Sequence, residues 1–283
     1  MLTLSGIRIY PIKSLAGISK TQAKLLPKGL EYDRRWMLVD DEGVFLTQRI
    51  HGVMALFDVH ESREGFVITY EGESIVLPYQ QSEPASPFEV QIWDDRVLAH
   101  EVGPDFSNWF SQRLGISCRL VAFPESNPRQ VDPSHAAPGE NVSLADAYPL
   151  MIIGESSLDD LNSKLDDPIT MNRFRPNLIF SGGTPYEEDS WKDFSIGESS
   201  FMGAKRCARC VLITINPSTG IKGVEPLRTL SKYRKENNKI YFGQNVIART
   251  YNEIRVGDTI LVTSRHQAIP QLTNNAHHDS AVS

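Results

Sequence analysis

The sequence predicts a mainly β protein with a few helices, an α+β fold built in two β-rich parts. Short alternating or β-branched runs follow one another from residue 35 to residue 102, and turns separate them. Regular spacing of this kind is typical of a barrel or sandwich. A second series of strand-like runs begins at residue 150, and apolar residues recur at helical spacing in only a few places.

The composition indicates a packed protein from a reducing compartment. The 283 residues include 40% hydrophobic side chains, enough for a core, and three cysteines, too few for a disulfide framework. No apolar run reaches transmembrane length, and no signal-peptide pattern follows Met1. A net charge of -6 argues against broad nucleic-acid binding. We therefore expect a cytoplasmic protein with no membrane and no nucleic-acid partner, in which an anionic ligand needs a local basic pocket.

The N-terminal part is expected to consist of strands and one helix. Residues 2–12 alternate loosely, so Lys13 and Ser14 are expected on the loop that leaves this strand. Residues 104–114 carry apolar side chains at helical spacing, and residues 118–123 return to a strand. Further strands are expected at residues 35–39, 44–47, 57–61, 66–70, 74–77, 89–93 and 97–102.

The segment 124–140 is rich in Pro, Ser, Asn and Gly and marks the expected boundary between the two parts. We predict one domain at residues 1–123, a second at 124–264, and a disordered tail at 265–283, which lacks periodicity. The elements expected in the second domain are a buried strand at 150–153, a helix beginning at Ser156 or Ser157, a hairpin at 194–204, a polar helix at 225–236, a strand at 239–249 and a closing strand at 254–262 broken at Gly257.

Two arginines near the middle of the second part form a candidate phosphate grip. The residue before a proline prefers extended backbone, and Pro176 follows Arg175. On extended backbone Arg173 and Arg175 share one side, from which two guanidinium groups can hold a phosphate with paired hydrogen bonds. The alternative is a ladder of surface ion pairs with the acidic run at residues 187–189.

Two of the three cysteines, Cys207 and Cys210, form a C-x-x-C motif among three basic residues. Positive charge near a thiol favours the thiolate, the form that attacks or binds a metal. A soft sulfur ligand suits a transition metal better than it suits a hard cation. Because a β-branched run begins at Val211, we expect the cysteines on a loop that leads into a strand.

The residues alone leave the role of this C-x-x-C motif open. A zinc site needs about four ligands, and neither Cys118 nor any His-x-x-x-His spacing supplies the missing ones. A thioredoxin-type motif opens a helix within a βαβ unit, whereas a strand pattern follows this one. A buried structural pair of cysteines accounts for the motif as well as a functional thiolate does.

Short motifs spread along nearly the whole chain carry a family resemblance. They are Tyr10-Pro11-Ile12-Lys13-Ser14, Asp33-Arg34-Arg35-Trp36, Asn172-Arg173-Phe174-Arg175-Pro176-Asn177, Asp189-Ser190-Trp191, Cys207-Ala208-Arg209-Cys210, Glu225-Pro226-Leu227-Arg228-Thr229-Leu230 and Phe242-Gly243-Gln244-Asn245. Each motif is weak alone, but their order and spacing are specific. Together they resemble MOSC-domain proteins of the molybdenum amidoxime-reducing component type, including bacterial reductases of N-hydroxylated bases.

The resemblance implies an N-terminal β-rich MOSC-N domain followed by a MOSC β-barrel-like domain. It implies a molybdenum–molybdopterin cofactor in the cleft between them, with Cys210 as metal ligand and catalytic residue and Cys207 in a supporting or neutral role. In the segment at Ala147 and Tyr148 the family often has small hydroxyl residues, so cofactor contacts there would come from the backbone or be lost. The remaining implied cofactor contacts are Lys13, Ser14, Arg34, Arg175, Asn177 and Asn245.

The activity implied by the resemblance is reduction of N–O bonds in small N-hydroxylated substrates, namely hydroxylamines, amidoximes and N-hydroxylated bases, by oxygen abstraction at molybdenum. Because no cysteine follows Cys210, electrons would come from a separate ferredoxin, flavoprotein reductase or cytochrome. Some MOSC domains are instead thought to carry sulfur or to take part in molybdenum-cofactor sulfuration, with a persulfide on Cys210. A β-rich binding protein with incidental cysteines is a third, non-enzymatic alternative.

Overall fold

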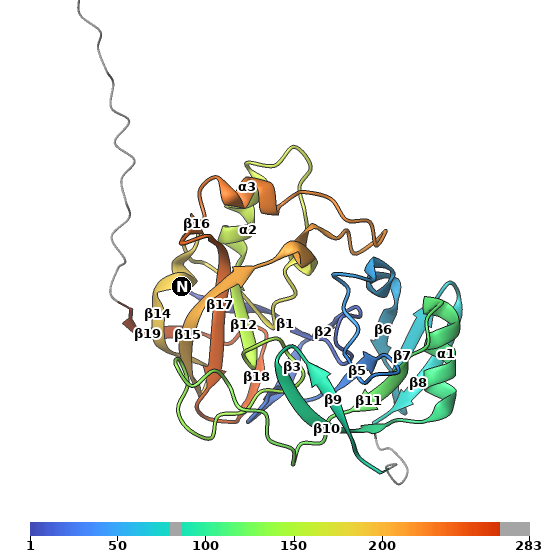
Figure 1. Ribbon diagram of the computed structural model, residues 1–283. Coiled ribbons are helices and arrows are strands. Elements are labelled where there is room, and N and C mark those ends of the chain that lie inside the picture. The colour runs from blue at the N-terminus through green and yellow to red at the C-terminus, as the bar shows by residue number, and fades with distance from the viewer. Residues whose placement is uncertain (80–85, 267–283) are drawn as a thin grey trace, which may run out of the picture.

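The computed structural model describes residues 1–79 and 86–266, and it confirms the predicted mainly β fold with few helices (Figure 1). Within these ranges the strands form one large sheet and three smaller ones. Over the same ranges, no helix is both long enough and apolar enough to cross a bilayer.

The large sheet has the strand order β19-β14-β15-β17-β12-β13-β1-β2, with β16 added beside β17. Only the central pair β12–β13 is parallel, and the other pairs are antiparallel. The first strands of the chain therefore complete a sheet made mostly from its second half. The strand bounds are β1 Thr3–Ile9, β2 Ile18–Lys20, β12 Leu150–Gly154, β13 Leu178–Ser181, β14 Trp191–Ile196, β15 Ser199–Arg209, β16 Lys235–Glu236, β17 Lys239–Ala248 and β19 Ile260–Arg265.

The three smaller sheets hold most of the short strands that the N-terminal sequence predicts. Their orders are β5-β11-β10-β9, β6-β7-β8 and β18-β3-β4. The last of these pairs a strand from the end of the chain with one from its beginning. The bounds are β3 Gln22–Leu26, β4 Gly29–Leu30, β5 Trp36–Val39, β6 Asp58–Glu61, β7 Gly65–Tyr70, β8 Glu73–Pro78, β9 Phe88–Ile92, β10 Asp95–Glu101, β11 Arg119–Ala122 and β18 Glu253–Arg255.

The predicted helix at residues 104–114 is confirmed as α1, Pro104–Leu114. Pro104 opens the helix with its ring-fixed φ, and Gly115 ends it at φ 68 while its N–H donates to the Ser111 carbonyl. The remaining helices are α2 Glu155–Asn162 and α3 Leu227–Ser231, with short 3-10 turns η1 Gly52–Leu56, η2 Met171–Arg173, η3 Glu187–Ser190 and η4 Val211–Thr214.

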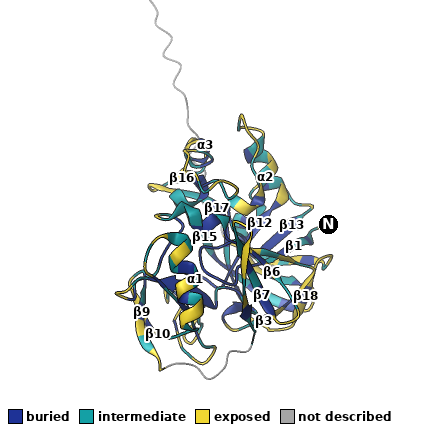
Figure 2. Cartoon of the chain, turned by 90° about the vertical axis from the view of Figure 1, so that its right-hand side faces the viewer, coloured by how far each residue is buried: buried dark blue, intermediate teal, exposed yellow. Residues whose placement is uncertain are grey.

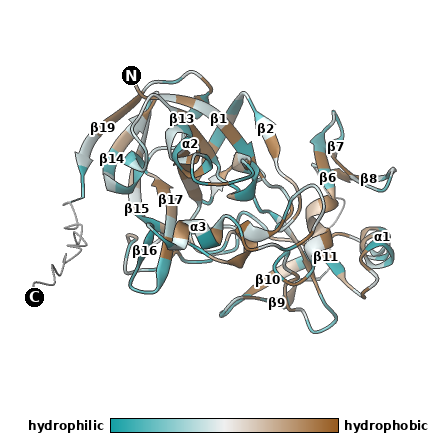
Figure 3. Ribbon diagram, turned by 90° about the horizontal axis from the view of Figure 1, so that it is seen from above, coloured by the Kyte–Doolittle hydropathy of each residue, from teal (hydrophilic) through white to brown (hydrophobic). Residues whose placement is uncertain are grey.

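One large apolar core joins the two halves of the chain. It brings Leu4 and Phe66 from the first half together with Trp191 and Phe201 from the second, all buried. Buried residues lie along the central strands and exposed residues on the outer face of α1 (Figure 2). Brown, apolar segments likewise follow the strands of the large sheet (Figure 3). Because burial of apolar surface is the main favourable term in folding, the two halves stabilise each other.

Three sequence predictions near the site are wrong. Cys207 does not lie on a loop but within β15. The run after Cys210 is not a strand but η4, in which the Thr214 hydroxyl donates to the Val211 carbonyl over 2.8 Å. Arg173 and Arg175 do not share one side of an extended segment, because Arg173 ends η2 and Arg175 has a left-handed φ of 56. Propensity and the proline rule are overridden here by packing of η2 against η4.

The end of the second half follows its prediction in part. The polar helix expected at residues 225–236 is shortened to α3, and Lys235–Glu236 instead forms β16. The break at Gly257 is confirmed, because β18 before it and β19 after it belong to different sheets. The tail predicted to be disordered lies almost wholly outside the described residues.

Candidate cofactor site

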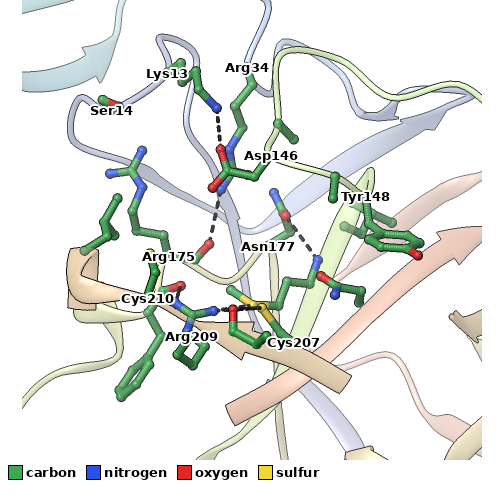
Figure 4. Close-up of a pocket in the computed structure, with 18 of the residues that line it drawn as sticks. Lys13, Ser14, Arg34, Asp146, Tyr148, Arg175, Asn177, Cys207, Arg209 and Cys210 are labelled. Carbon is green, nitrogen blue, oxygen red and sulfur yellow. Dashed lines mark hydrogen bonds and ion pairs between the residues drawn. The ribbon is translucent and has the colours of Figure 1, made fainter. Parts of the chain in front are cut away.

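Every site residue implied by the family resemblance lines one cavity of about 310 Å³, whereas Arg173 of the predicted phosphate grip does not. The lining also carries six basic side chains against a single carboxylate, in a protein of net charge -6. Figure 4 shows basic side chains and a carboxylate toward one end and the two cysteines toward the other. We call these the cationic end and the sulfur end. The candidate residues in the lining are Lys13, Ser14, Arg34, Ala147, Tyr148, Arg175, Asn177, Asn245 and Cys210.

Lys13 is held at the cationic end by groups from the other half of the chain. The residue is 5% exposed, and its ammonium donates to the Leu144 carbonyl over 2.9 Å and to the Asp146 carboxylate over 2.5 Å. Burial lowers the pKa of Lys13 to about 8, although Asp146 opposes the shift. Asp146 also pairs with Arg49 over 3.0 Å. A single carboxylate therefore fixes two cations in the lining.

The ring of Tyr10 supports two arginines of the cationic end. The guanidinium carbons of Arg34 and Arg175 each lie 4.2 Å from the ring centroid. Cation–π contact of this kind fixes a planar guanidinium without using its hydrogen-bond donors. Arg34 also donates to the carbonyl of Arg175 over 3.2 Å, and Arg175 donates to the carbonyl of Leu15 over 2.6 Å.

The buried carboxylate of Asp33 binds both Tyr10 and Arg34. Asp33 is 0% exposed, and it accepts from the Tyr10 N–H over 2.8 Å and from the Arg34 guanidinium over 2.7 Å. Burial lowers the pKa of Arg175 to about 10, so its guanidinium keeps its charge at neutral pH.

Three of the candidate cofactor contacts have left-handed backbone. The φ angles are 70 for Ser14, 50 for Arg34 and 56 for Arg175. This conformation is costly for residues with a Cβ, about 1–3 kcal/mol each, and such strain gathers at ligand sites. The strain is an independent reason, besides their charge, to regard this end of the cavity as functional.

The two cysteines at the sulfur end differ in their surroundings. Cys207 lies on β15, packs beside an apolar cluster, and accepts a hydrogen bond from Arg209 over 3.1 Å. Cys210 follows the strand as the residue that caps η4, and its thiol makes no hydrogen bond to the described part of the chain. The structure therefore leaves the thiol of Cys210 available in the cavity, while that of Cys207 is engaged.

The four remaining candidates contribute unequally. The Asn177 amide is committed, accepting from the Met151 N–H over 3.3 Å and donating to the Arg8 carbonyl over 3.2 Å. It therefore ties β1 to β12, and its amide has little left for a ligand. Ala147 and Asn245 line the wall, and the buried hydroxyl of Tyr148 has no hydrogen-bond partner among the described residues.

Sequence reasoning missed the groups that position the cations. Tyr10 lies inside one of the motifs, and Asp146 directly precedes Ala147. Nothing in the sequence, however, marks a tyrosine as a support for two arginines before the fold is known. Arg49 carries no motif, and Arg209 stands out in the sequence only as a charge near the cysteines. Arg209 donates to the Phe174 carbonyl over 2.7 Å and so ties the sulfur end to the turn that carries Arg175.

Comparison with known proteins agrees with this architecture. A model of the MOSC N-terminal beta barrel domain matches residues 1–117, and a model of the MOSC domain matches residues 139–261. The chain is 32% identical over 278 residues to mitochondrial amidoxime-reducing component 1 of Mus musculus, covering 91% of this chain and 81% of that protein. The chain belongs to the MOSC-domain family.

Two further relatives of the chain carry names that indicate different functions. Mitochondrial amidoxime-reducing component 1 of Homo sapiens is 30% identical over 280 residues, which cover 91% of this chain and 82% of that protein. Molybdenum cofactor sulfurase of Oryza sativa subsp. japonica is 31% identical over 289 residues, which cover 95% of this chain but 35% of the sulfurase. This MOSC chain thus corresponds to only part of the sulfurase.

Proposed function

We propose that the protein is a molybdenum-cofactor-dependent reductase of N–O bonds in N-hydroxylated compounds. The observation that carries the proposal is one cavity with an available thiol, Cys210, at one end and the arginines Arg34 and Arg175 at the other. A soft sulfur suits a transition metal, and guanidinium groups suit a phosphate, so the two ends match the two ends of a metal–pterin phosphate.

The lining fits such a cofactor on grounds of its own chemistry. Six basic side chains line the cavity, and Asp146 is the carboxylate among the lining residues. Asp33 and Asp132 pair with Arg34 and Lys205 from outside the lining, yet positive charge remains in excess, and a phosphate would reduce it. Two buried polar atoms of lining residues, Nε of Arg49 and the hydroxyl of Tyr148, have no hydrogen-bond partner in the described ranges. Buried polar atoms in native proteins are nearly always paired. Each of these two atoms is inaccessible in the ligand-free cavity, so its side chain would have to move before it could meet a ligand.

The chain's own residues divide into ligands and positioning groups. The Cys210 thiolate would bind the metal, and Lys13, Arg34 and Arg175 would hold the terminal phosphate. Tyr10 positions the two arginines through its ring. When bound, the cofactor supplies the redox chemistry that removes the oxygen of an N–O bond as water, with electrons from a separate ferredoxin, flavoprotein reductase or cytochrome.

The direct test is metal and pterin measurement on the protein purified from a host that makes the cofactor. We expect equimolar molybdenum and pterin, and reduction of a hydroxylamine substrate when reduced benzyl viologen supplies electrons. Protein that holds neither metal nor pterin under these conditions contradicts the proposal.

A second candidate function is sulfur transfer, favoured by the similarity to the part of the rice molybdenum cofactor sulfurase that matches. In that case the available thiol of Cys210 would carry a persulfide. A labile persulfide on Cys210, released by a reductant from protein that lacks metal, supports this alternative and excludes the reductase.

A further inference from the structure

A second cavity, of about 590 Å³, lies beside the cofactor cavity. It is bounded by the turn after α2, by η2, by the start of α3 and by the loop at residues 214–224. Both α2 and α3 lie at the upper end of the molecule in Figures 1 and 2. None of the candidate cofactor residues lines it, so the proposed reductase function gives it no role.

The cavity contains a cation without a counterpart. The Arg173 side chain is partly buried, yet its guanidinium makes no hydrogen bond or ion pair with any described residue. Burial lowers its pKa. Of the three other basic residues in the lining, Lys164 pairs with Asp160 over 2.5 Å and Arg228 pairs with Glu225 over 2.6 Å. The third, Lys232, has no ion pair within the described residues, but it is exposed to solvent.

An unpaired, partly desolvated guanidinium is costly and presents a planar fork of donors that matches a carboxylate or phosphate. Two features of the lining decide between these anions. Asp166 and Asp167 line the cavity and disfavour a doubly charged phosphate. Two apolar residues of the lining are exposed, 69% for Ile221 and 59% for Val224, and would cover a hydrocarbon group.

We propose that this cavity is a binding site for a small monocarboxylate with a branched hydrocarbon chain, in which Arg173 holds the carboxylate and Ile221 and Val224 cover the chain. One ligand would then cover the exposed apolar surface of these two residues and supply the negative charge that Arg173 lacks.

The site shares walls with the cofactor cavity but not side chains. Arg173 faces one cavity and Arg175 the other, although a single residue separates them. Likewise Cys210 and Leu212 line the cofactor cavity, whereas Thr214, at the far end of η4, lines the second. Binding at Arg173 therefore does not depend on the metal or on the thiol of Cys210.

Isothermal titration calorimetry of the full chain with isovalerate tests the proposal, with isovaleramide as the uncharged probe. We expect isovalerate to bind with one-to-one stoichiometry and the amide to bind about tenfold more weakly or not at all, because a charge-assisted hydrogen bond is lost. Arg173→Gln should reduce isovalerate affinity by about tenfold or more. Arg228→Gln, which removes a paired arginine from the same lining, should not.

Equal affinity for the acid and the amide, or unchanged affinity in a folded Arg173→Gln protein, overturns the proposal. Tighter binding of inorganic phosphate than of isovalerate, when it is lost in Arg173→Gln and kept in Arg175→Ala, overturns the assigned ligand class. The thermal unfolding curve of each variant confirms that it is folded. Cys210→Ser should bind isovalerate like the parent, so this site and the reductase function are tested separately.

Discussion

The cationic end and the sulfur end of the cofactor cavity are held in opposite ways. At the cationic end, Lys13, Arg34 and Arg175 each already have a partner within the chain. At the sulfur end, the thiol of Cys210 has no hydrogen-bond partner in the described ranges, and its neighbour Cys207 holds the contact with Arg209. The cationic end is therefore pre-organised without a ligand, whereas the sulfur end leaves the thiol of Cys210 without a hydrogen-bond partner in the described ranges.

The difference suggests a division of labour. Groups locked by their neighbours lose little freedom when a ligand binds, so they are suited to anchoring. A thiol with no other commitment is suited to bonding a metal. Changes at the sulfur end should therefore remove activity, and changes at the cationic end should weaken cofactor retention.

The largest effect is expected for Cys210→Ser. Loss of the metal ligand should lower viologen-linked reductase activity by more than about 100-fold, since even outer-shell partners of metals are worth 10–100-fold. Cys207→Ser is the matched control, and it should retain activity within about tenfold. Equal loss in both variants would show that the two cysteines are not distinguished as the structure suggests.

Next in size is Arg175→Ala. The loss of charge-assisted hydrogen bonds to a phosphate should lower cofactor affinity by about tenfold to 100-fold, seen as lower molybdenum content. The effect on urea unfolding should be smaller. Arg206→Ala is the control, because Arg206 also lies over a tyrosine, 4.3 Å from the Tyr241 ring, but does not line the cavity. Near-normal molybdenum content in Arg175→Ala argues against the phosphate anchor.

Lys13 should make cofactor retention depend on pH. Burial lowers its pKa to about 8, so in the cofactor-free protein the ammonium loses its proton as pH rises through that value. Affinity for the anionic cofactor should be full below about 8 and fall by up to about tenfold per pH unit above it. The free energy of unfolding should instead rise with pH between about 8 and 10.5. In this range the unfolded chain still holds the Lys13 proton, up to its ordinary pKa of 10.5, whereas the folded chain has lost it. Lys13→Arg should flatten the affinity profile, and a parent profile that is already flat would contradict the role of Lys13.

The smallest effect is expected for Ser14→Gly. Glycine adopts the φ of 70 at this position without strain, so the free energy of unfolding should rise by up to about 1 kcal/mol. Cofactor retention should fall at the same time if the Ser14 side chain contacts the cofactor. Denaturant unfolding and molybdenum measurement on one preparation give both values, and a destabilised variant would show that the turn is not strained.

The sequence was sufficient for the fold and for the grouping of the candidate residues. Alternating runs and turns located the strands, because the period of side chains along a half-buried strand is a local property. Five motifs, together with the segment at Ala147 and Tyr148, located residues that line one cavity. Local rules failed where tertiary contacts hold the backbone in a strained conformation. Arg175, for example, has a left-handed φ although a residue before proline prefers extended backbone.

The positioning groups could not be predicted, since their roles are relations between distant segments. The role of Tyr10 follows from the contacts of its ring with Arg34 and Arg175. The role of Asp146 follows from its ion pairs with Lys13 and Arg49. Neither set of contacts can be inferred from the local sequence. The second cavity could not be predicted from the sequence for the same reason. An arginine without a partner, such as Arg173, is recognisable only when its surroundings are known.

The place of β1 in the large sheet has a consequence for biosynthesis. Its partner β13 ends at Ser181, and Thr3 is bridged to Thr259. Strand β1 must therefore wait, unpaired on that side, until β13 has been made. The loop carrying Lys13 and Ser14 follows this strand directly, so the anchor for the cofactor can be assembled only late in synthesis, and a nascent chain stalled before β13 should be unable to bind it.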